Sequence, residues 1–145
     1  MEVIKAMIVA ITGGRGFIGS CLVEKHLNQD DEVRVLSRKR ISQKNRAQIF
    51  IGDLANKDSD FTDFVDGVDV LYNCAGEYKN ESLMHELHID GTQSLINSSK
   101  GRIGRWIQLS SVGVYGPCRK GIITEKLKKI LMENMKKLML KLRKL

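Results

Sequence analysis

Short apolar runs recur along the first three quarters of the chain, and each is too short to form a buried helix. The first run is rich in β-branched residues and is followed directly by glycines, which is typical of a buried parallel strand. Between several runs lie stretches with helical spacing of apolar positions, so the pattern predicts an α/β domain with a parallel sheet. The predicted strands are Ala6–Ile11, Glu32–Leu36, Ala47–Ile51, Val68–Asn73 and Arg105–Leu109, and the predicted helices are Phe17–Leu27, Asp60–Val65 and Glu81–Ser98.

A glycine-rich loop stands where the first strand ends and the first helix begins. Gly13 permits a tight turn, Gly16 lets backbone approach a pyrophosphate, and Gly19 lets the helix pack closely on the strand. The helix N-terminus then offers N–H donors and a partial positive charge to anionic phosphate. The alternative is a glycine turn without a ligand, which the strand before it and the helix after it disfavour. We therefore predict a Rossmann-like, doubly wound sheet of about five strands, with dinucleotide contacts from Gly13, Gly14, Arg15, Gly16, Phe17, Ile18 and Gly19.

The loop, with its Gly-Phe-Ile-Gly ending, resembles the extended short-chain dehydrogenases/reductases, which include the nucleotide-sugar epimerases and dehydratases. Further segments over about residues 6–124 resemble landmarks of that family, in the family's order. Ser111 takes the place of the catalytic Ser/Thr, and His88 departs from the family, which usually has Asn there. The resemblance implies that Asp53 and Leu54 of Gly52-Asp53-Leu54, and Asn73, Cys74, Ala75 and Gly76, line the cofactor site, and that Leu109–Gly116 corresponds to the segment ending Val-Tyr-Gly.

Each of these landmarks also has a purely structural interpretation. Asp53 could cap the short acidic helix that follows it, and Asn73 could close a turn. Ser110 and Ser111 could satisfy backbone groups at the end of a strand. Taken with the glycine loop, the landmarks favour contact with a cofactor.

The end of the second predicted strand bears on the choice of cofactor. An NAD site needs a carboxylate about 20 residues past the loop for the ribose hydroxyls, whereas a 2′-phosphate needs a nearby cation. Residues 36–40 read Leu-Ser-Arg-Lys-Arg, without an acid. The Arg38 guanidinium can hold a phosphate through two charge-assisted hydrogen bonds, so we predict NADP in preference to NAD. The alternative is an ordinary solvated loop.

The catalytic Tyr-x-x-x-Lys pair that the resemblance implies is not found. In the family, the Lys lowers the pKa of a Tyr that exchanges a proton with the substrate oxygen. Here Tyr72, Tyr78 and Tyr115 are followed four positions later by Gly76, Ser82 and Arg119. We therefore expect a chain that binds a dinucleotide but is catalytically inactive alone. Two alternatives stay open: an NADP-dependent oxidoreductase or epimerase of a sugar nucleotide completed by a partner chain, and a nucleotide-sensing interaction module.

Charge and composition change sharply near residue 124. Residues 125–145 hold eight Lys/Arg against two Glu, whereas residues 1–124 hold sixteen against fifteen. We predict a dinucleotide-binding domain over residues 1–124 and a basic amphipathic helix over residues 125–145. Because the body is nearly neutral, we expect no nucleic-acid partner, and the tail is more typical of a solvated helix than of a membrane anchor. Homo-oligomers are possible. The tail's apolar stripe is Leu127, Leu131, Met135, Leu138, Leu142 and Leu145.

The same abrupt change permits the hypothesis of a shifted reading frame. Codons allowed for Lys129–Leu138, read with each third base joined to the next two, can encode Asn-Pro-Tyr-Gly-Glu-Tyr-Glu-Lys-Thr. That peptide resembles the family's sequence around its catalytic Tyr. The coding DNA decides the question, because other third bases at these codons would remove the hypothesis.

The cysteines and the N-terminus indicate the compartment. Cys21, Cys74 and Cys118 are scattered, without disulfide pairing or metal-ligand spacing, so we expect reduced thiols and no metal site. The N-terminus lacks the features of a secretory signal, and no early apolar run reaches the roughly 18 residues of a membrane span. These features predict a cytoplasmic protein.

Overall fold

A computed structural model describes residues 6–40, 45–77, 79–111, 121–122 and 124. The chain divides into two units, Met1–Gln108 and Leu109–Leu145, and the sheet belongs to the first. The helix predicted over residues 125–145, together with Tyr115 and Cys118, lies outside the described residues. The domain boundary predicted after residue 124 falls within the second unit and stays a prediction.

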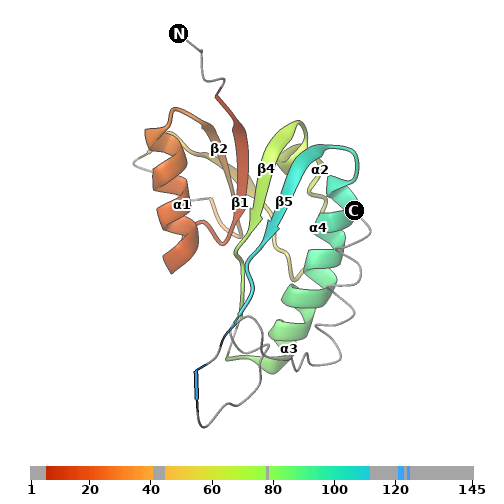
Figure 1. Ribbon diagram of the computed structural model, residues 1–145. Helices are drawn as coiled ribbons and strands as arrows, with labels where there is room; N and C mark the ends of the chain where they lie inside the picture. The colour runs from red at the N-terminus through yellow and green to blue at the C-terminus, as the bar shows by residue number, and fades with distance from the viewer. Residues whose placement is uncertain (1–5, 41–44, 78, 112–120, 123, 125–145) are drawn as a thin grey trace. The chain divides into compact units, whose positions relative to one another are not determined.

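Five parallel strands form one sheet in the order β3-β2-β1-β4-β5. The chain moves outward from β1 to β3, then crosses back and continues from β4 to β5, so the order reverses between β1 and β4 (Figure 1). The predicted doubly wound sheet is confirmed, and open sheets of this kind bind ligands beyond the carboxyl ends of the strands at that reversal. The strands are β1 (Ile8–Thr12), β2 (Glu32–Ser37), β3 (Gln48–Ile51), β4 (Val68–Asn73) and β5 (Ile103–Gln108).

Helices cover both faces of this sheet (Figure 1). Helix α1 (Phe17–Asn28) lies on one face, and α2 (Thr62–Val65) and α4 (Thr92–Ser99) lie on the other. The single helix predicted over Glu81–Ser98 is instead three consecutive segments: α3 (Glu81–His85), the π-helix η1 (Glu86–Gly91) and α4. Within the described ranges, no helix combines the length and the apolar character needed to cross a membrane.

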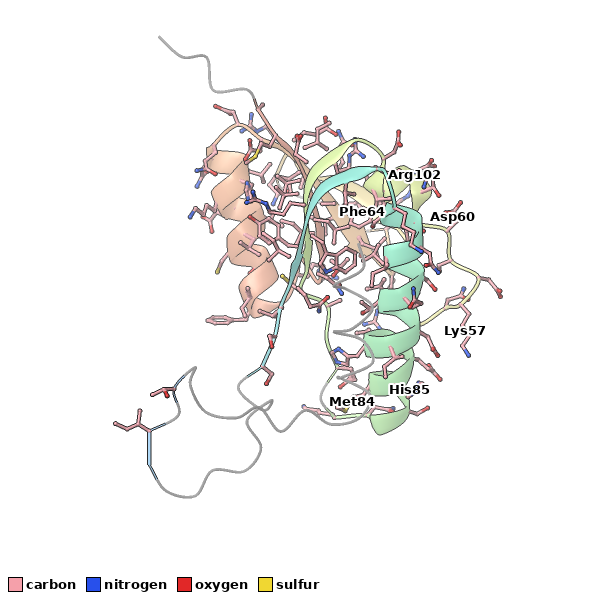
Figure 2. All side chains as sticks on the ribbon, turned by 45° about the vertical axis from the view of Figure 1, so that its right-hand side comes forward. Lys57, Asp60, Phe64, Met84, His85 and Arg102 are labelled. Atoms are coloured by element: carbon pink, nitrogen blue, oxygen red, sulfur yellow. The ribbon has the colours of Figure 1, made fainter. Side chains whose placement is uncertain are left out.

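The two faces of the sheet have separate cores because side chains alternate along each strand. Val9 and Ile11 of β1 pack with Val23 of α1, whereas Ala10 between them packs on the opposite side with the α2 and α4 layer. Phe64, which lies between the sheet and these helices in Figure 2, is 2% exposed. Burial of an aromatic or aliphatic side chain of this size contributes about 1.5–3 kcal/mol. The sheet is therefore held from both sides, and its strand ends keep fixed relative positions.

At the amino-terminal edge of the sheet, a buried polar cluster joins α1 to the strands. His26 Nδ1 lies 2.7 Å from Asp31 Oδ2, and His26 Nε2 lies 3.2 Å from the Tyr72 hydroxyl. The other carboxylate oxygen of Asp31 accepts the Met7 amide at 2.9 Å. Since buried polar groups are costly unless they are paired, this cluster fixes the C-terminal part of α1 against Met7, which precedes β1, and against Tyr72 of β4.

Candidate functional site

The glycine loop connects β1 to α1 and lies against the segment that follows β4. Gly13 has a φ of 64°, in the left-handed region that favours glycine. A Cβ added there would lie 2.7 Å from the Ala75 nitrogen and 2.8 Å from the Cys74 carbonyl oxygen. Two features therefore require glycine at position 13: the left-handed backbone of the turn, and the close approach of the glycine loop to the backbone of Cys74 and Ala75.

The N-terminus of α1 has backbone N–H groups without a side-chain acceptor. Its N-cap is Gly16, which makes no side-chain capping bond, and the first turn has no acidic residue. The Gly16 amide donates to the Gly13 carbonyl at 2.9 Å, so the loop closes tightly under the helix. A Cβ at Gly19 would lie 2.2 Å from the Gly13 oxygen. The helix thus begins with backbone N–H groups that no side chain caps, next to a loop of glycines, and such N–H groups are the donors that a helix N-terminus offers to a phosphate group.

The other loop residues divide between packing and exposure. Gly14 is buried, and a Cβ there would lie 2.8 Å from Val35 Cγ1 of β2. The sequence did not predict this packing role, because the contact with Val35 arises only in the folded domain. Arg15 is exposed, while the Phe17 and Ile18 side chains are 90% and 44% exposed. Two large apolar side chains are thus presented beside the uncapped helix end.

Asn73, at the end of β4, is the centre of a buried hydrogen-bond network. Its side chain is 2% exposed and accepts the Thr12 hydroxyl at 2.6 Å. Its amide nitrogen donates to Thr92 Oγ1 at 3.3 Å and to Gln108 Oε1 at 3.1 Å. Asn73 therefore ties the carboxyl ends of β1, β4 and β5 to the start of α4. The buried Asn73 side chain thus orders the strand ends, and its contact with a cofactor stays a prediction.

The rest of the segment after β4 follows from this network. The Ala75 amide donates to Thr12 Oγ1 at 3.1 Å, which places Cys74, Ala75 and Gly76 beside the glycine loop. Cys74 is half-buried, and burial raises the pKa of its thiol above the ordinary value. Thr12 thus connects the two predicted cofactor segments, although the sequence analysis assigned it no role.

Asp53 and Leu54 follow β3 at the same edge of the sheet. Asp53 Oδ1 accepts the Ala55 amide at 3.0 Å, and the Asp53 carbonyl accepts the Ser59 hydroxyl at 2.9 Å. Leu54 is 6% exposed and belongs to the core. The carboxylate thus orders its own turn, while the side chain of Leu54 anchors that turn to the sheet.

The start of α2 is bonded by Asp60, not by Asp53. Asp60 Oδ1 accepts both the hydroxyl and the amide of Thr62, at 2.7 and 2.9 Å. These two bonds lower the pKa of Asp60 below its ordinary value, and the bond from the Thr62 hydroxyl has the larger effect. The alternative in which Asp53 caps the short acidic helix is therefore wrong. The Asp53 carboxylate instead bonds within the turn after β3.

Two predicted site residues are less constrained. Arg38 is exposed directly after β2, in a turn in which the Ser37 hydroxyl donates to the Lys39 carbonyl at 2.8 Å. Ser111 is exposed and belongs to the second unit, so its catalytic role stays a prediction. Among the described residues, no three His, Cys, Asp or Glu side chains are grouped as a metal site requires.

The burial of Cys74 predicts slow alkylation. A raised thiol pKa leaves less thiolate near neutral pH, and burial limits access of the reagent, so we expect Cys74 to react more slowly than the exposed Cys21. Because Cys74 adjoins the glycine loop, added dinucleotide should slow it further without changing Cys21. Iodoacetamide labelling followed by peptide mass spectrometry measures both rates. Equal rates for the two thiols would contradict the burial described here.

Comparison with curated proteins finds partial relatives. The chain is 29% identical over 102 residues to the mouse (Mus musculus) sterol-4-alpha-carboxylate 3-dehydrogenase, decarboxylating, an alignment that covers 68% of this chain and 28% of the relative. It is 32% identical over 137 residues to the low-salt glycan biosynthesis protein Agl12 of Haloferax volcanii, covering 82% of the chain and 44% of the relative. The chain thus spans less than half the length of either relative.

Solved structures share the fold. MoeE5 in complex with UDP-glucuronic acid and NAD superposes with a TM-score of 0.75 at 21% identity, covering 94% of this chain and 47% of that one. A short-chain dehydrogenase/reductase superfamily protein of Agrobacterium tumefaciens with bound NAD gives a TM-score of 0.74 at 18% identity, covering 92% and 42%. At these identities, the likeness shows the fold alone.

The family assignment comes from the sequence match. The sequence model of the NAD dependent epimerase/dehydratase family matches residues 9–135, which include every cofactor-site residue predicted above. The match continues past residue 124 into the basic tail. The chain therefore belongs to the NAD dependent epimerase/dehydratase family.

Proposed function

We propose that this chain binds a nicotinamide dinucleotide, with the pyrophosphate against the amides at the start of α1. The observation that carries this proposal is the uncapped helix end beneath a loop whose glycines tolerate no side chain, at Gly13 and Gly19 above all. A pyrophosphate supplies the acceptors and the negative charge that such a helix end lacks. Family membership supports the same cofactor class, since the family is described as NAD dependent.

Neighbouring segments fit the rest of the nucleotide. Because all five strands are parallel, the turn after β3 and the segment after β4 share the edge of the sheet that carries the glycine loop. We assign Asp53 and Leu54 to the adenine side, as the family resemblance implies. We assign Cys74, Ala75 and Gly76 to the wall next to the pyrophosphate, because their backbone abuts Gly13.

Within this proposal, Arg38 favours NADP. Its guanidinium is exposed after β2, and within the described ranges it makes no ion pair with an acidic residue. A 2′-phosphate would give it a doubly hydrogen-bonded partner. The solved relatives cited above contain NAD, so this preference is a property proposed for the present chain alone.

Titration calorimetry with NAD and NADP tests the binding and the preference together. We expect NADP to bind roughly tenfold more tightly, a difference of about one charge-assisted hydrogen bond, and Arg38→Ala to remove that difference while leaving NAD affinity unchanged. Lys25→Ala, which removes an exposed charge from α1, is the matched control. NAD binding as tightly as NADP would overturn the preference, and binding of neither nucleotide would overturn the proposed function.

We further propose that this chain alone binds without turnover. The general acid–base pair Tyr-x-x-x-Lys does not occur in the sequence, and loss of general acid–base catalysis costs about 10²–10⁴-fold in rate. Absorbance of NADPH in the presence of UDP-sugars should therefore stay constant; steady consumption would favour the alternative of catalysis completed by a partner chain. We propose a cytoplasmic location, consistent with the reduced thiols expected above.

A further inference from the structure

His88 lies in the π-helix η1 and faces the backbone that follows the Asn73–Gly76 segment. Its Nε2 lies 3.1 Å from the Glu77 nitrogen and 2.9 Å from the Glu77 carbonyl oxygen. The ring also fills the space beside Gly76, where an added Cβ would lie 3.3 Å from His88 Cε1. The imidazole therefore packs beside Gly76, the last residue of one predicted cofactor segment, and hydrogen-bonds to Glu77 directly after it.

The same π-helix contacts the second predicted cofactor segment. A Cβ added at Gly91 would lie 2.1 Å from the Leu54 carbonyl oxygen, so η1 packs backbone to backbone against the turn after β3. Immediately after η1, Thr92 accepts the Asn73 side chain at 3.3 Å and donates to the Leu87 carbonyl at 3.4 Å. The π-helix and the residue directly after it thus contact the turn after β3, the end of β4 and the segment after β4. Such π-turns recur at functional sites.

Imidazole chemistry suits His88 to this position. A neutral ring with its hydrogen on Nδ1 accepts the Glu77 N–H through Nε2, and a ring with hydrogen on Nε2 donates to the Glu77 carbonyl. We take the first form, in which the Glu77 N–H is the donor to Nε2. The Asn that the family usually carries here is shorter than His, because its carboxamide ends at the δ position. His88 therefore reaches a backbone group in this chain through an atom that Asn lacks.

We propose that His88 is a positioning residue for the dinucleotide. By holding the backbone at Gly76–Glu77, it keeps the Cys74–Gly76 wall against Gly13, where the pyrophosphate would lie. This inference rests on the proposed function and adds to it the side chain that sets the wall. His88 itself touches no part of the cofactor in this proposal.

Three proteins test the proposal: wild type, His88→Phe and His88→Gln. Phe keeps the packing beside Gly76 without a polar atom, and Gln places a donor and an acceptor near the position of Nε2. We expect His88→Phe to weaken dinucleotide binding roughly three- to tenfold, the size of one hydrogen bond, and His88→Gln to recover most of that loss. His85→Phe is the control, because His85 lies exposed on α3 (Figure 2) and its Nδ1 lies 3.8 Å from Asp90 Oδ2 of η1, not against the backbone after β4.

A measurement on the wild type keeps the test independent of variant folding. Amide exchange followed by NMR should show protection at Glu77, and the Glu77 and Cys74 amide resonances should move in His88→Phe but much less in His88→Gln. Unchanged affinity in His88→Phe, or a Glu77 amide that exchanges as fast as exposed backbone, would overturn the inference. A wild type that binds neither NAD nor NADP would instead overturn the proposed function. In that case protection of the Glu77 amide would show the hydrogen bond to His88 but no role of His88 in binding a dinucleotide.

Discussion

Gly19→Ala should abolish measurable dinucleotide binding. The added methyl group would lie 2.2 Å from the Gly13 carbonyl oxygen and 2.7 Å from its carbonyl carbon, so either the loop or the first turn of α1 must move. Moving either one takes the helix amides out of line with a pyrophosphate. Loss of two charge-assisted hydrogen bonds is worth on the order of 100-fold in affinity. Calorimetry with NAD and NADP measures it.

A matched control separates this effect from general damage to α1. Ser20→Ala alters the next residue of the same helix, where the hydroxyl is exposed and donates only to the Phe17 carbonyl at 3.2 Å. We expect Ser20→Ala to bind normally, while Gly19→Ala also loses about 1–3 kcal/mol in the free energy of unfolding from overpacking. Binding of dinucleotide by Gly19→Ala with wild-type affinity would refute the loop as the pyrophosphate site.

Asn73→Leu should be the most destabilising polar substitution in the described part of the chain. Leucine has the branching and the number of side-chain heavy atoms of asparagine but leaves Thr12, Thr92 and Gln108 each without one hydrogen-bond partner. Each buried polar group left without a partner costs about 1–3 kcal/mol, so the two buried threonines lead us to expect a total loss of roughly 2–6 kcal/mol. Urea unfolding followed by circular dichroism measures it.

The matched control for that substitution lies on α4. Asn97 is exposed and accepts a hydrogen bond from Gln93 at 3.0 Å, so Asn97→Ala should change the free energy of unfolding by less than about 0.5 kcal/mol. Equal stability of Asn73→Leu and Asn97→Ala would mean that the network at the strand ends contributes nothing. Dinucleotide affinity should fall in Asn73→Leu as well, because Thr12 then loses the partner that holds it beneath Ala75.

Much of the fold could be predicted from periodicity alone. The strand β4 was predicted with its observed bounds, and α1 begins at Phe17 as expected, because apolar runs and glycines mark these positions directly. The π-turn over Glu86–Gly91 could not be predicted in the same way. Its local sequence suits an ordinary helix, and the extra residue is accommodated by tertiary packing of Gly91 on the Leu54 carbonyl, about which local propensity carries no information.

The candidate site was predictable where a residue acts through its backbone. Gly13 forms the tight turn and Gly19 allows close packing of α1, as inferred from the glycine spacing. Both roles depend on the absence of a side chain, which the sequence gives directly. Asn73 differs, because its partners lie 61, 19 and 35 residues away in the chain and meet it only in the folded sheet. Thr12 and His88 were not assigned roles for the same reason.

The strand order also has a consequence for how the chain acquires its structure during synthesis. Strand β1 leaves the ribosome before the other four strands and can pair with β2 after a few tens of residues. Its other neighbour, β4, follows much later in the chain, as the pairing of Val9 with Val70 shows. Until that stretch has emerged, one edge of the central strand stays without a partner. Long-range parallel pairing of this kind slows folding and prolongs the exposure of apolar strand edges to other nascent chains. The glycine loop, which needs Ala75 against Gly13, is therefore among the later parts of the sheet to be completed.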